Sequence, residues 1–293
     1  MAIRNVQSEQ EHLRRMWSAA KVIADDAVWT AMDGGRSNPI WRVDLADGPS
    51  LVCKLYDPSS ATPLFANDGN REALALQTLE GVSIAPRFVA FRTSAIGESL
   101  VYRHIEGNTW QGDLKEIAVL MAQLHQLQPP AALPSLSSAP KSLIATAQRM
   151  LKETESGLPA PPSAPDLPAP RQAFLHGDIV PGNILVTPKG VRLIDWQCPA
   201  IGDPSLDLAV FLSPAMQVAY GRRPLSAEEV STFLATYADA SHDCLTVDRY
   251  RALAPLFHWR MAAYCQWKVA HGDDAYAQGI GLELAALDRL EQR

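Results

Sequence analysis

The sequence predicts an α+β protein of two parts, with antiparallel strands in the first part and mainly helices in the second. Two stretches near the N-terminus alternate like strand pairs, and the region beyond residue 205 has helical periodicity to its end. With 293 residues, 47% of them apolar, the chain can bury the core that such a protein needs. We place the two parts at residues 1–103 and 104–293.

The first part reads as helix, strand pair, helix and strand pair. Residues 6–24 have the spacing of an amphipathic helix. IWRVDLADGPSLVCKLY follows, and its Asp47-Gly48 pair is typical of a hairpin turn. NREALALQTLEG has helical periodicity with polar capping candidates before it, and RFVAFRT and ESLVYRHI form the second strand pair.

The second part begins where Gly107 breaks the strand pattern and LKEIAVLMAQLHQL resumes a helix. Ten of the 22 prolines lie between Pro129 and Pro170. We interpret residues 157–170, GLPAPPSAPDLPAP, as an extended and exposed connector.

Composition and charge exclude several classes of function. The net charge is −6, and no basic block suggests nucleic-acid or membrane binding. The N-terminus is too polar for a signal peptide, and no apolar run reaches the roughly 20 residues that span a bilayer. We expect a cytoplasmic monomer or homodimer that binds neither nucleic acid nor membrane. Its scattered cysteines, which we expect to be reduced and mostly buried, are Cys53, Cys198, Cys244 and Cys265.

The stretch FLHGDIVPGNILV places Asp178 and Asn183 on a loop between apolar runs. A carboxylate there can orient a hydroxyl or accept its proton, and an amide oxygen can coordinate a hard cation such as Mg²⁺. Asp195, at the end of the apolar run in RLIDWQ, offers a second hard oxygen ligand. Because Mg²⁺ with so few protein ligands usually relies on phosphates, a nucleotide is implied.

Upstream residues offer positive charge and backbone donors for such a nucleotide. Lys54 lies in the apolar strand LVCKLY, where a buried ammonium needs an acidic partner, and Glu72 in the following helix is the candidate. DGGRSN would by itself more often be a surface turn, but its position before the Lys54 strand favours phosphate binding. The candidates within it are Gly34, Gly35, Ser37 and Asn38.

The order of Gly-rich turn, strand lysine, helix glutamate, H-G-D-x-x-x-x-N and I-D-W resembles the aminoglycoside phosphotransferase and choline kinase family. The resemblance covers nearly the whole chain. It implies a two-lobed protein-kinase-like fold, with a nucleotide-binding N-lobe and a catalytic, substrate-binding C-lobe. It also implies that backbone around Arg103 to Ile105 reads adenine, and that Asp207 braces the catalytic loop.

The resemblance assigns the remaining roles residue by residue. Asp178 is implied as the catalytic base, with Asn183 and Asp195 as magnesium ligands. Lys54 and Glu72 are implied as the ion pair that positions the phosphates. ATP is the implied phosphoryl donor and Mg²⁺ the implied cofactor.

Two departures from protein kinases indicate a small-molecule hydroxyl acceptor. Gly177 stands where protein kinases usually carry an arginine, so control by phosphorylation is not expected. Only seven residues separate Asp195 from Asp203, too few for a segment that docks a peptide. Many family members carry an acid at the position of Gln197, so no cation-binding role is carried over to it.

The acceptor itself is suggested by aromatic residues. Trp259, Tyr264 and Trp267 fall within an arc of about 140° at helical spacing, and such faces attract amines. The alternative is that this stripe is core. Asp203 either faces the substrate or braces a loop. We expect an amino alcohol of the choline, ethanolamine or thiamine type first, and an aminoglycoside or other sugar second.

Two functions of other classes remain as alternatives. His176 and Asp178 could form part of a hydrolase metal site, although the other histidines are not spaced as ligands and Lys54 has no role in it. The chain could also be a pseudokinase scaffold that binds nucleotide without turnover. His176 is otherwise expected to be structural, packed beneath the loop.

Overall fold

The computed structural model describes residues 6–32, 37–154 and 157–292. The chain divides into two compact units. The first runs to Gly107 and also takes in Ile194–Cys198, and the second holds Asn108–Leu193 and the chain from Pro199 onward. The first unit thus ends slightly beyond the boundary placed at residue 103, and the later segment in it was not foreseen.

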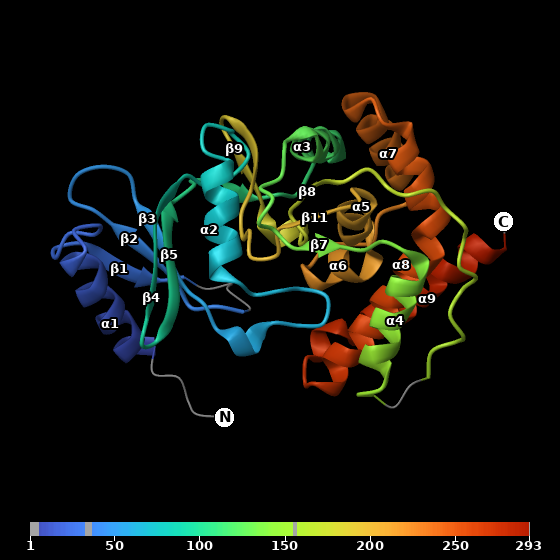
Figure 1. Ribbon diagram of the computed structural model, residues 1–293, viewed down its shortest axis with the longest axis horizontal. Helices are drawn as coiled ribbons and strands as arrows, with labels where there is room; N and C mark the ends of the chain where they lie inside the picture. Colours follow the sequence, from blue (N-terminus) through green and yellow to red (C-terminus); the bar gives the residue numbers. More distant parts are fainter. Residues whose placement is uncertain (1–5, 33–36, 155–156, 293) are drawn as a thin grey trace. The chain divides into compact units, whose positions relative to one another are not determined.

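In the described part of the first unit, the strands form an antiparallel sheet with the order β1-β2-β3-β5-β4 (Figure 1). The expected hairpin joins β2 to β3, and Gly48 in its turn has a φ of +103°, which glycine adopts without strain. β3 lies at the centre, and every residue of it is buried. The elements are α1 (Val6–Ala19), β1 (Val28–Ala31), β2 (Ile40–Asp44), β3 (Leu51–Leu55), a 3₁₀ turn (Pro58–Ser60), α2 (Gly69–Thr78), β4 (Phe88–Ser94) and β5 (Gly97–Arg103).

Helix α1 forms the core of the first unit together with the sheet. Leu13 and Trp17 on its apolar face have no exposed surface, and they cluster with Trp41 and Val43 of β2. Nε1 of Trp17 donates to Oγ of Ser99 over 3.1 Å, so the indole N–H is satisfied inside the core. This packing fixes the sheet whose central strand carries Lys54.

The second unit is mainly helical, with two small sheets of the orders β10-β9-β6 and β7-β11-β8 in its described part. α4 packs along the long helix α8, and α3 packs against α7 (Figure 1). The elements are β6 (Asn108–Thr109), α3 (Leu114–Gln126), β7 (Ser135–Leu136), α4 (Pro140–Leu151), β8 (Ala173–Leu175), a 3₁₀ turn (Pro181–Asn183), β9 (Ile184–Thr187), β10 (Gly190–Leu193), β11 (Ala200–Gly202), α5 (Ser205–Leu212), α6 (Pro214–Ala219), α7 (Ala227–Ser241), α8 (Cys244–Ala270), a 3₁₀ turn (Asp274–Tyr276) and α9 (Ala277–Glu291).

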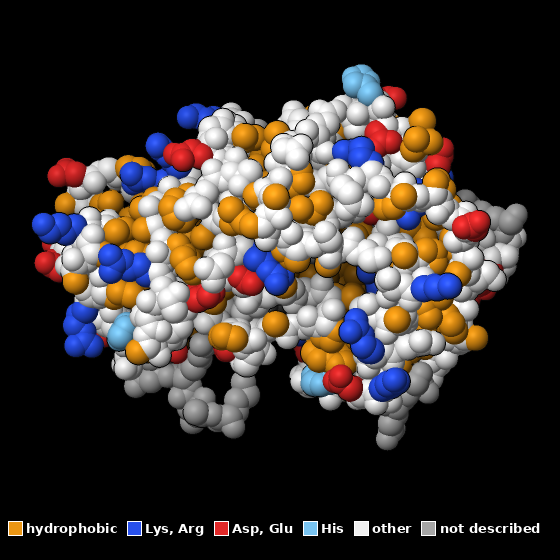
Figure 2. All heavy atoms as spheres, viewed as in Figure 1, with side chains coloured by type: hydrophobic (Ala, Val, Ile, Leu, Met, Phe, Trp, Pro, Cys, Tyr) orange, Lys and Arg blue, Asp and Glu red, His pale blue; other side chains and the backbone are white. Residues whose placement is uncertain are grey.

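The expected connector has no helix or strand between residues 157 and 172, whereas α4, which precedes it, was not predicted. All four cysteines are free, and three of them are buried, as expected, while Cys244 is exposed. On the face seen in Figure 2, basic and acidic side chains are intermingled. No helix in the described residues has the length and apolarity needed to cross a membrane.

Candidate active site

Lys54 lies in the central strand of the first unit, and its ammonium pairs with Glu72 of α2. Nζ of Lys54 donates to Oε2 of Glu72 over 2.8 Å, and each residue is only 1% exposed. A buried ammonium is strongly disfavoured unless it is paired. The two residues that the sequence analysis paired are therefore joined by a buried ion pair.

The segment Ile194–Cys198 brings two further acceptors to Lys54. Oδ1 of Asp195 accepts a hydrogen bond from Nζ, and Oε1 of Gln197 accepts another over 3.1 Å. Because an ammonium has three N–H donors, Glu72, Asp195 and Gln197 together can satisfy all of them. We call Lys54 and these three acceptors the lysine cluster.

Asp195 holds an uncommon backbone conformation within the lysine cluster. Its φ is +64°, in the left-handed region that few residues other than glycine, asparagine and aspartate adopt. Strain of this kind is found most often at functional sites, where the surroundings hold it in place. Its side chain keeps 32% of its surface exposed although Lys54 binds one of its oxygens.

The lysine cluster carries one excess negative charge when its ammonium and two carboxylates are ionised. Burial alone would lower the pKa of Lys54, but the charges of Asp195 and Glu72 outweigh it and raise the pKa. Burial raises the pKa of Glu72 against the opposing effect of Lys54. Glu72 also accepts the Tyr56 hydroxyl over 2.5 Å and the Trp196 N–H over 3.2 Å. Glu72 is thus enclosed by donors, and Asp195, the more exposed acid, is the carboxylate that a cation can reach.

Asn38 ties the segment before β2 to the lysine cluster. Its Nδ2 donates to Oε1 of Gln197 over 2.9 Å, and its Oδ1 accepts a backbone N–H from the loop after β3 over 2.9 Å. Asn38 is buried, while Ser37 beside it is half-buried. Gly34 and Gly35, the other candidates in this segment, lie outside the described residues.

The expected adenine-reading backbone follows strand β5. The N–H of Arg103 donates to the Arg87 carbonyl over 2.8 Å, and the N–H of His104 donates to the Ser50 carbonyl over 2.9 Å. Among the described residues, none forms a hydrogen bond with the backbone of Ile105. Its N–H and C=O are therefore able to bind the edge of a planar base, whereas the N–H of Arg103 is already used.

In the second unit, Asp178 and Asn183 lie on the loop between β8 and β9. Nδ2 of Asn183 donates to the Asp178 carbonyl over 2.9 Å and to its Oδ2 over 3.1 Å. His176 has no exposed surface, and its Nδ1 accepts the Asp178 N–H over 3.2 Å, which agrees with the expected structural role. The loop thus holds its aspartate and asparagine against each other.

Asp207 of α5 holds this loop in place through hydrogen bonds to its backbone. Its carboxylate accepts the backbone N–H groups of His176 over 2.9 Å and Gly177 over 2.8 Å. It also binds Nε2 of His125 over 3.1 Å, and Nδ1 of that ring lies 2.8 Å from the Tyr237 hydroxyl. Because a carboxylate only accepts, Nε2 carries a proton and donates it to Asp207, while Nδ1 shares a second hydrogen bond with the tyrosine hydroxyl. We call these residues the aspartate network.

His125 and Tyr237 were not predicted as parts of the site. His125 did give a signal, because it interrupts the apolar face of LKEIAVLMAQLHQ and a buried imidazole needs partners. Tyr237 gave none, since it is 112 residues from His125 in the sequence and meets it only because α3 packs against α7.

Gly182, between Asp178 and Asn183 in the sequence, was not singled out either. A Cβ at this position would lie 2.5 Å from the ring of Tyr220, closer than any side chain allows. Only glycine therefore lets Tyr220 cover the loop at this point.

The aromatic residues expected to form a cage for an amine lie on α8 with their rings packed. Trp259 and Tyr264 are each 2% exposed, and Nε1 of Trp259 donates to the Pro159 carbonyl over 3.0 Å. The Trp267 ring stacks with Tyr264 at 6.3 Å and with His271 at 4.0 Å between centroids. For Trp259 and Tyr264 these contacts favour the alternative interpretation, in which the stripe belongs to the core, whereas Trp267 is only half-buried.

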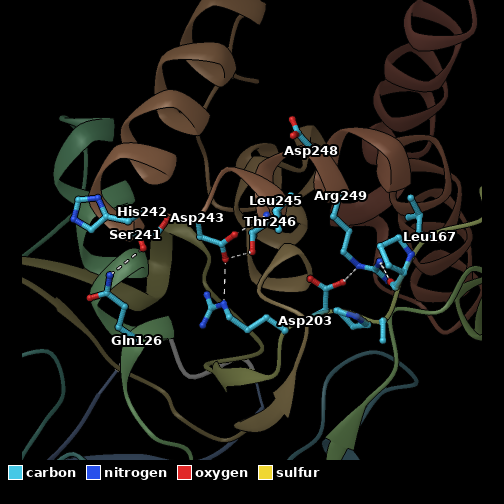
Figure 3. A pocket seen from close by; sticks show the side chains of 14 residues that line it. Gln126, Leu167, Asp203, Ser241, His242, Asp243, Leu245, Thr246, Asp248 and Arg249 are labelled. Carbon is cyan, nitrogen blue, oxygen red and sulfur yellow. Dashed lines mark hydrogen bonds and ion pairs between the residues drawn. The ribbon is translucent and has the colours of Figure 1, made fainter.

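Asp203 has the contacts of a bracing residue. It is 1% exposed, its Oδ1 accepts the Ser205 N–H over 2.9 Å, and its Oδ2 accepts the Ser138 hydroxyl over 2.5 Å. Arg249 points at the same carboxylate and pairs with it (Figure 3). Of the two roles left open by the sequence, these contacts favour bracing.

A strand lysine held by a helix glutamate, an aspartate beside it and a braced loop with an aspartate and an asparagine are the parts of a phosphoryl-transfer enzyme. The chain belongs to the phosphotransferase enzyme family, whose model matches residues 28–256. It is therefore a phosphotransferase with an alcohol group as acceptor. No curated protein matches the sequence.

Solved structures of the same fold include kinases of small alcohols. A choline/ethanolamine kinase family protein from Mesorhizobium loti has a TM-score of 0.66 and 15% identity, with 97% of this chain and 95% of that chain covered. An ethanolamine kinase from Plasmodium vivax has a TM-score of 0.67 and 14% identity, covering 97% and 89%. A macrolide 2'-phosphotransferase from Brachybacterium faecium has a TM-score of 0.57 and 18% identity, covering 94% and 98%. The predicted α+β, protein-kinase-like fold and the predicted family are confirmed.

Proposed function

We propose that this phosphotransferase transfers the γ-phosphoryl group of ATP to a hydroxyl of a small molecule. The observation that carries the proposal is the lysine cluster, in which carboxylates hold a buried amine at the centre of a sheet and raise its pKa. Phosphoryl transfer needs a fixed positive charge at the phosphates rather than covalent chemistry by the protein. An amicoumacin kinase of this fold, with a TM-score of 0.59, was solved with AMP-PNP, which supports an ATP-type donor.

Magnesium is the proposed cofactor, and two side chains suit it. Asn183 donates with its Nδ2 to Asp178, which leaves its Oδ1 as a hard oxygen ligand. Asp195 gives one carboxylate oxygen to Lys54 and retains the other. The described residues contain no group of three or more His, Cys, Asp or Glu side chains able to hold a metal, so phosphate oxygens would complete the shell. Bound Mg²⁺ would offset the negative charge of the phosphates.

Asp178 is the residue that we expect to act on the acceptor. The hydrogen bond from Asn183 fixes its carboxylate, which can then orient a hydroxyl and accept its proton during transfer. Lys54 would offset charge on the α- and β-phosphates, and Ile105 would bind the adenine edge through its backbone. We place the reaction in the cytoplasm, where ATP is supplied.

We propose an amino alcohol as the acceptor class, with an aminoglycoside or another sugar as the alternative. Fold similarity supports the first, because the choline and ethanolamine kinases reach TM-scores of 0.65 to 0.67 and the macrolide phosphotransferases 0.55 and 0.57. The net charge of −6 also suits a ligand that carries an amine.

The test is ADP release with a panel of small alcohols and sugars, in the parent enzyme and in Asp178→Asn. We expect the variant to bind ATP as before and to turn over about 10²- to 10⁴-fold more slowly, since it loses a proton acceptor that orients the hydroxyl. The matched control is Asp166→Asn in the exposed connector, which should change nothing.

Unchanged turnover in Asp178→Asn with the best acceptor would reject the assignment. The alternative of another class is a nucleotide-binding scaffold. It would be favoured if the parent protein bound ATP but none of the acceptors in the panel led to ADP release. The polar positions that turnover requires are all present, namely Lys54, Glu72, Asp178, Asn183 and Asp195.

A further inference from the structure

Arg260, near the middle of α8, is a cation without a counter-charge. Its Nε is buried and has no hydrogen-bond partner, and no carboxylate in the described part of the chain pairs with it. Its neighbour is the ring of Phe257, 5.6 Å from the guanidinium carbon. Burial lowers the pKa of Arg260 to about 10, and no acidic side chain opposes this effect.

Arg249 shows what the same helix does with a structural arginine. It lies eleven residues before Arg260, about three turns of helix, and so on the same face. Its Nε donates to the buried carboxylate of Asp203, and its other nitrogens donate to the Pro168 carbonyl over 2.6 Å and to the Ser138 hydroxyl over 3.2 Å. Arg249 is thus neutralised and hydrogen-bonded within the protein, whereas Arg260 is not.

The second unit also contains a cavity of about 540 Å³, but no unpaired arginine among the described residues lines it (Figure 3). The two arginines in its lining are already paired, Arg171 with Asp243 and Arg249 with Asp203. An anionic ligand there would compete with existing ion pairs for both arginines. Arg260 is therefore the stronger candidate for binding a charged ligand.

An unpaired guanidinium that is partly withdrawn from water destabilises the folded protein. Its planar edge of N–H donors fits a carboxylate or a phosphate through two parallel hydrogen bonds. Arg260 as a whole keeps part of its surface exposed, so a ligand can reach it although its Nε is buried. An anionic group would supply both the missing acceptor and the missing charge.

We propose that Arg260 anchors an anion-binding subsite, and that the group it binds is a carboxylate or phosphate of the hydroxyl-bearing acceptor. The identity of the ligand rests on the proposed function, but the presence of the subsite does not. The subsite adds a requirement to the acceptor: besides its hydroxyl, the acceptor carries an acid group.

The first experiment measures binding by thermal unfolding. L-serine, D-glycerate and inorganic phosphate are each compared with chloride at equal ionic strength. We expect a rise of a few degrees in the parent protein and in Arg251→Gln, a matched control at an exposed arginine of the same helix, and a loss of that rise in Arg260→Gln. Without ligand, Arg260→Gln should melt no lower than the parent, since it removes an unpaired charge.

Three outcomes of this experiment overturn the subsite. The first is that Arg260→Gln keeps every shift that the parent shows, and the second is that the parent shows no shift. The third is that Arg260→Gln melts lower without ligand, as the loss of a structural arginine would cause.

The second experiment identifies the ligand with pairs of acceptors that differ by one carboxylate, L-serine with ethanolamine and D-glycerate with ethylene glycol. The parent should favour the acid of each pair by about 10- to 100-fold in kcat/KM, the worth of a charged hydrogen bond. Arg260→Gln should lose this preference through KM, and Arg260→Lys should keep part of it.

Equal use of both members by the parent enzyme overturns the proposed ligand and leaves the proposed function standing. If no acceptor in any pair releases ADP, the proposed function fails instead. The melting measurements still decide the subsite in that case, because they require no turnover.

Discussion

The lysine cluster of the first unit and the aspartate network of the second are both built around buried charge, but only one of them is complete. Asp207 has no exposed surface, and its oxygens accept two backbone N–H groups and one imidazole N–H. In the lysine cluster, two carboxylates face one ammonium, and Asp195 keeps 32% of its side chain exposed. In the aspartate network every carboxylate oxygen has a protein partner, and the network holds a loop in place. In the lysine cluster one carboxylate oxygen of Asp195 stays open to a ligand.

This difference separates residues that position from residues that bind. Both networks contain a buried aspartate or glutamate with several donors, so burial and hydrogen bonding alone do not mark a functional group. What marks it is a charged group with an atom that no protein partner occupies. Both oxygens of Asp207 accept hydrogen bonds, whereas Asp195 keeps one oxygen open and the Nε of Arg260 has no partner among the described residues.

Within the two networks, the largest effect should come from Asp195→Asn. Asparagine tolerates the left-handed backbone of this position and keeps an oxygen for Lys54, but it removes the excess negative charge. We expect turnover to fall by about 10²- to 10³-fold, as with the loss of one electrostatic contact to a developing charge. The melting temperature should stay the same or rise, because like charge is removed from the lysine cluster.

ADP release measures the expected fall in turnover, and differential scanning calorimetry measures the melting temperature. A strongly lowered melting temperature in Asp195→Asn would show that the lysine cluster is as complete as the aspartate network, and the comparison would break.

Asp207→Asn tests the other side of the comparison. In the variant, the NH₂ group of asparagine replaces one of the two carboxylate oxygens, and it faces N–H donors that it cannot accept. We therefore expect a loss of about 2–3 kcal/mol in the free energy of unfolding. Tyr237→Phe removes only the outermost hydrogen bond and should lose about 1 kcal/mol. Chemical denaturation measures both. The comparison fails if Asp207→Asn is as stable as the parent or if Tyr237→Phe loses more than Asp207→Asn.

Sequence reasoning reached the binding residues better than the positioning residues, for a physical reason. Lys54, Asp178 and Asn183 each interrupt a local apolar pattern, and a polar group in such a place signals a use. Asp207 was inferred only from resemblance, and Tyr237 had no local signal at all. Its role depends on α3 meeting α7, a contact that no local spacing encodes.

The fold class followed from periodicity, but two features of the site did not. Asp195 reaches Lys54 across 141 residues of sequence, because Ile194–Cys198 belongs to the first unit. The aromatic stripe on α8 has helical spacing whether its rings are packed or open, so spacing could not decide between cage and core. The orphaned Nε of Arg260 is likewise visible only once its surroundings are known.

The smallest effect should come from Gln197→Glu, which sharpens the comparison by adding charge without removing an acceptor. Oε1 of Gln197 accepts from Lys54 over 3.1 Å and from Asn38 over 2.9 Å, and a glutamate oxygen can accept from both. The added negative charge makes the lysine cluster more attractive to a cation. We expect half-maximal ADP release at a few-fold lower Mg²⁺ concentration, measured by Mg²⁺ titration, with the ATP-saturated rate unchanged. Gln197→Met, which removes the acceptor without adding charge, should not lower the Mg²⁺ requirement. A higher requirement in Gln197→Glu would mean that excess negative charge at the lysine cluster does not serve to bind the metal.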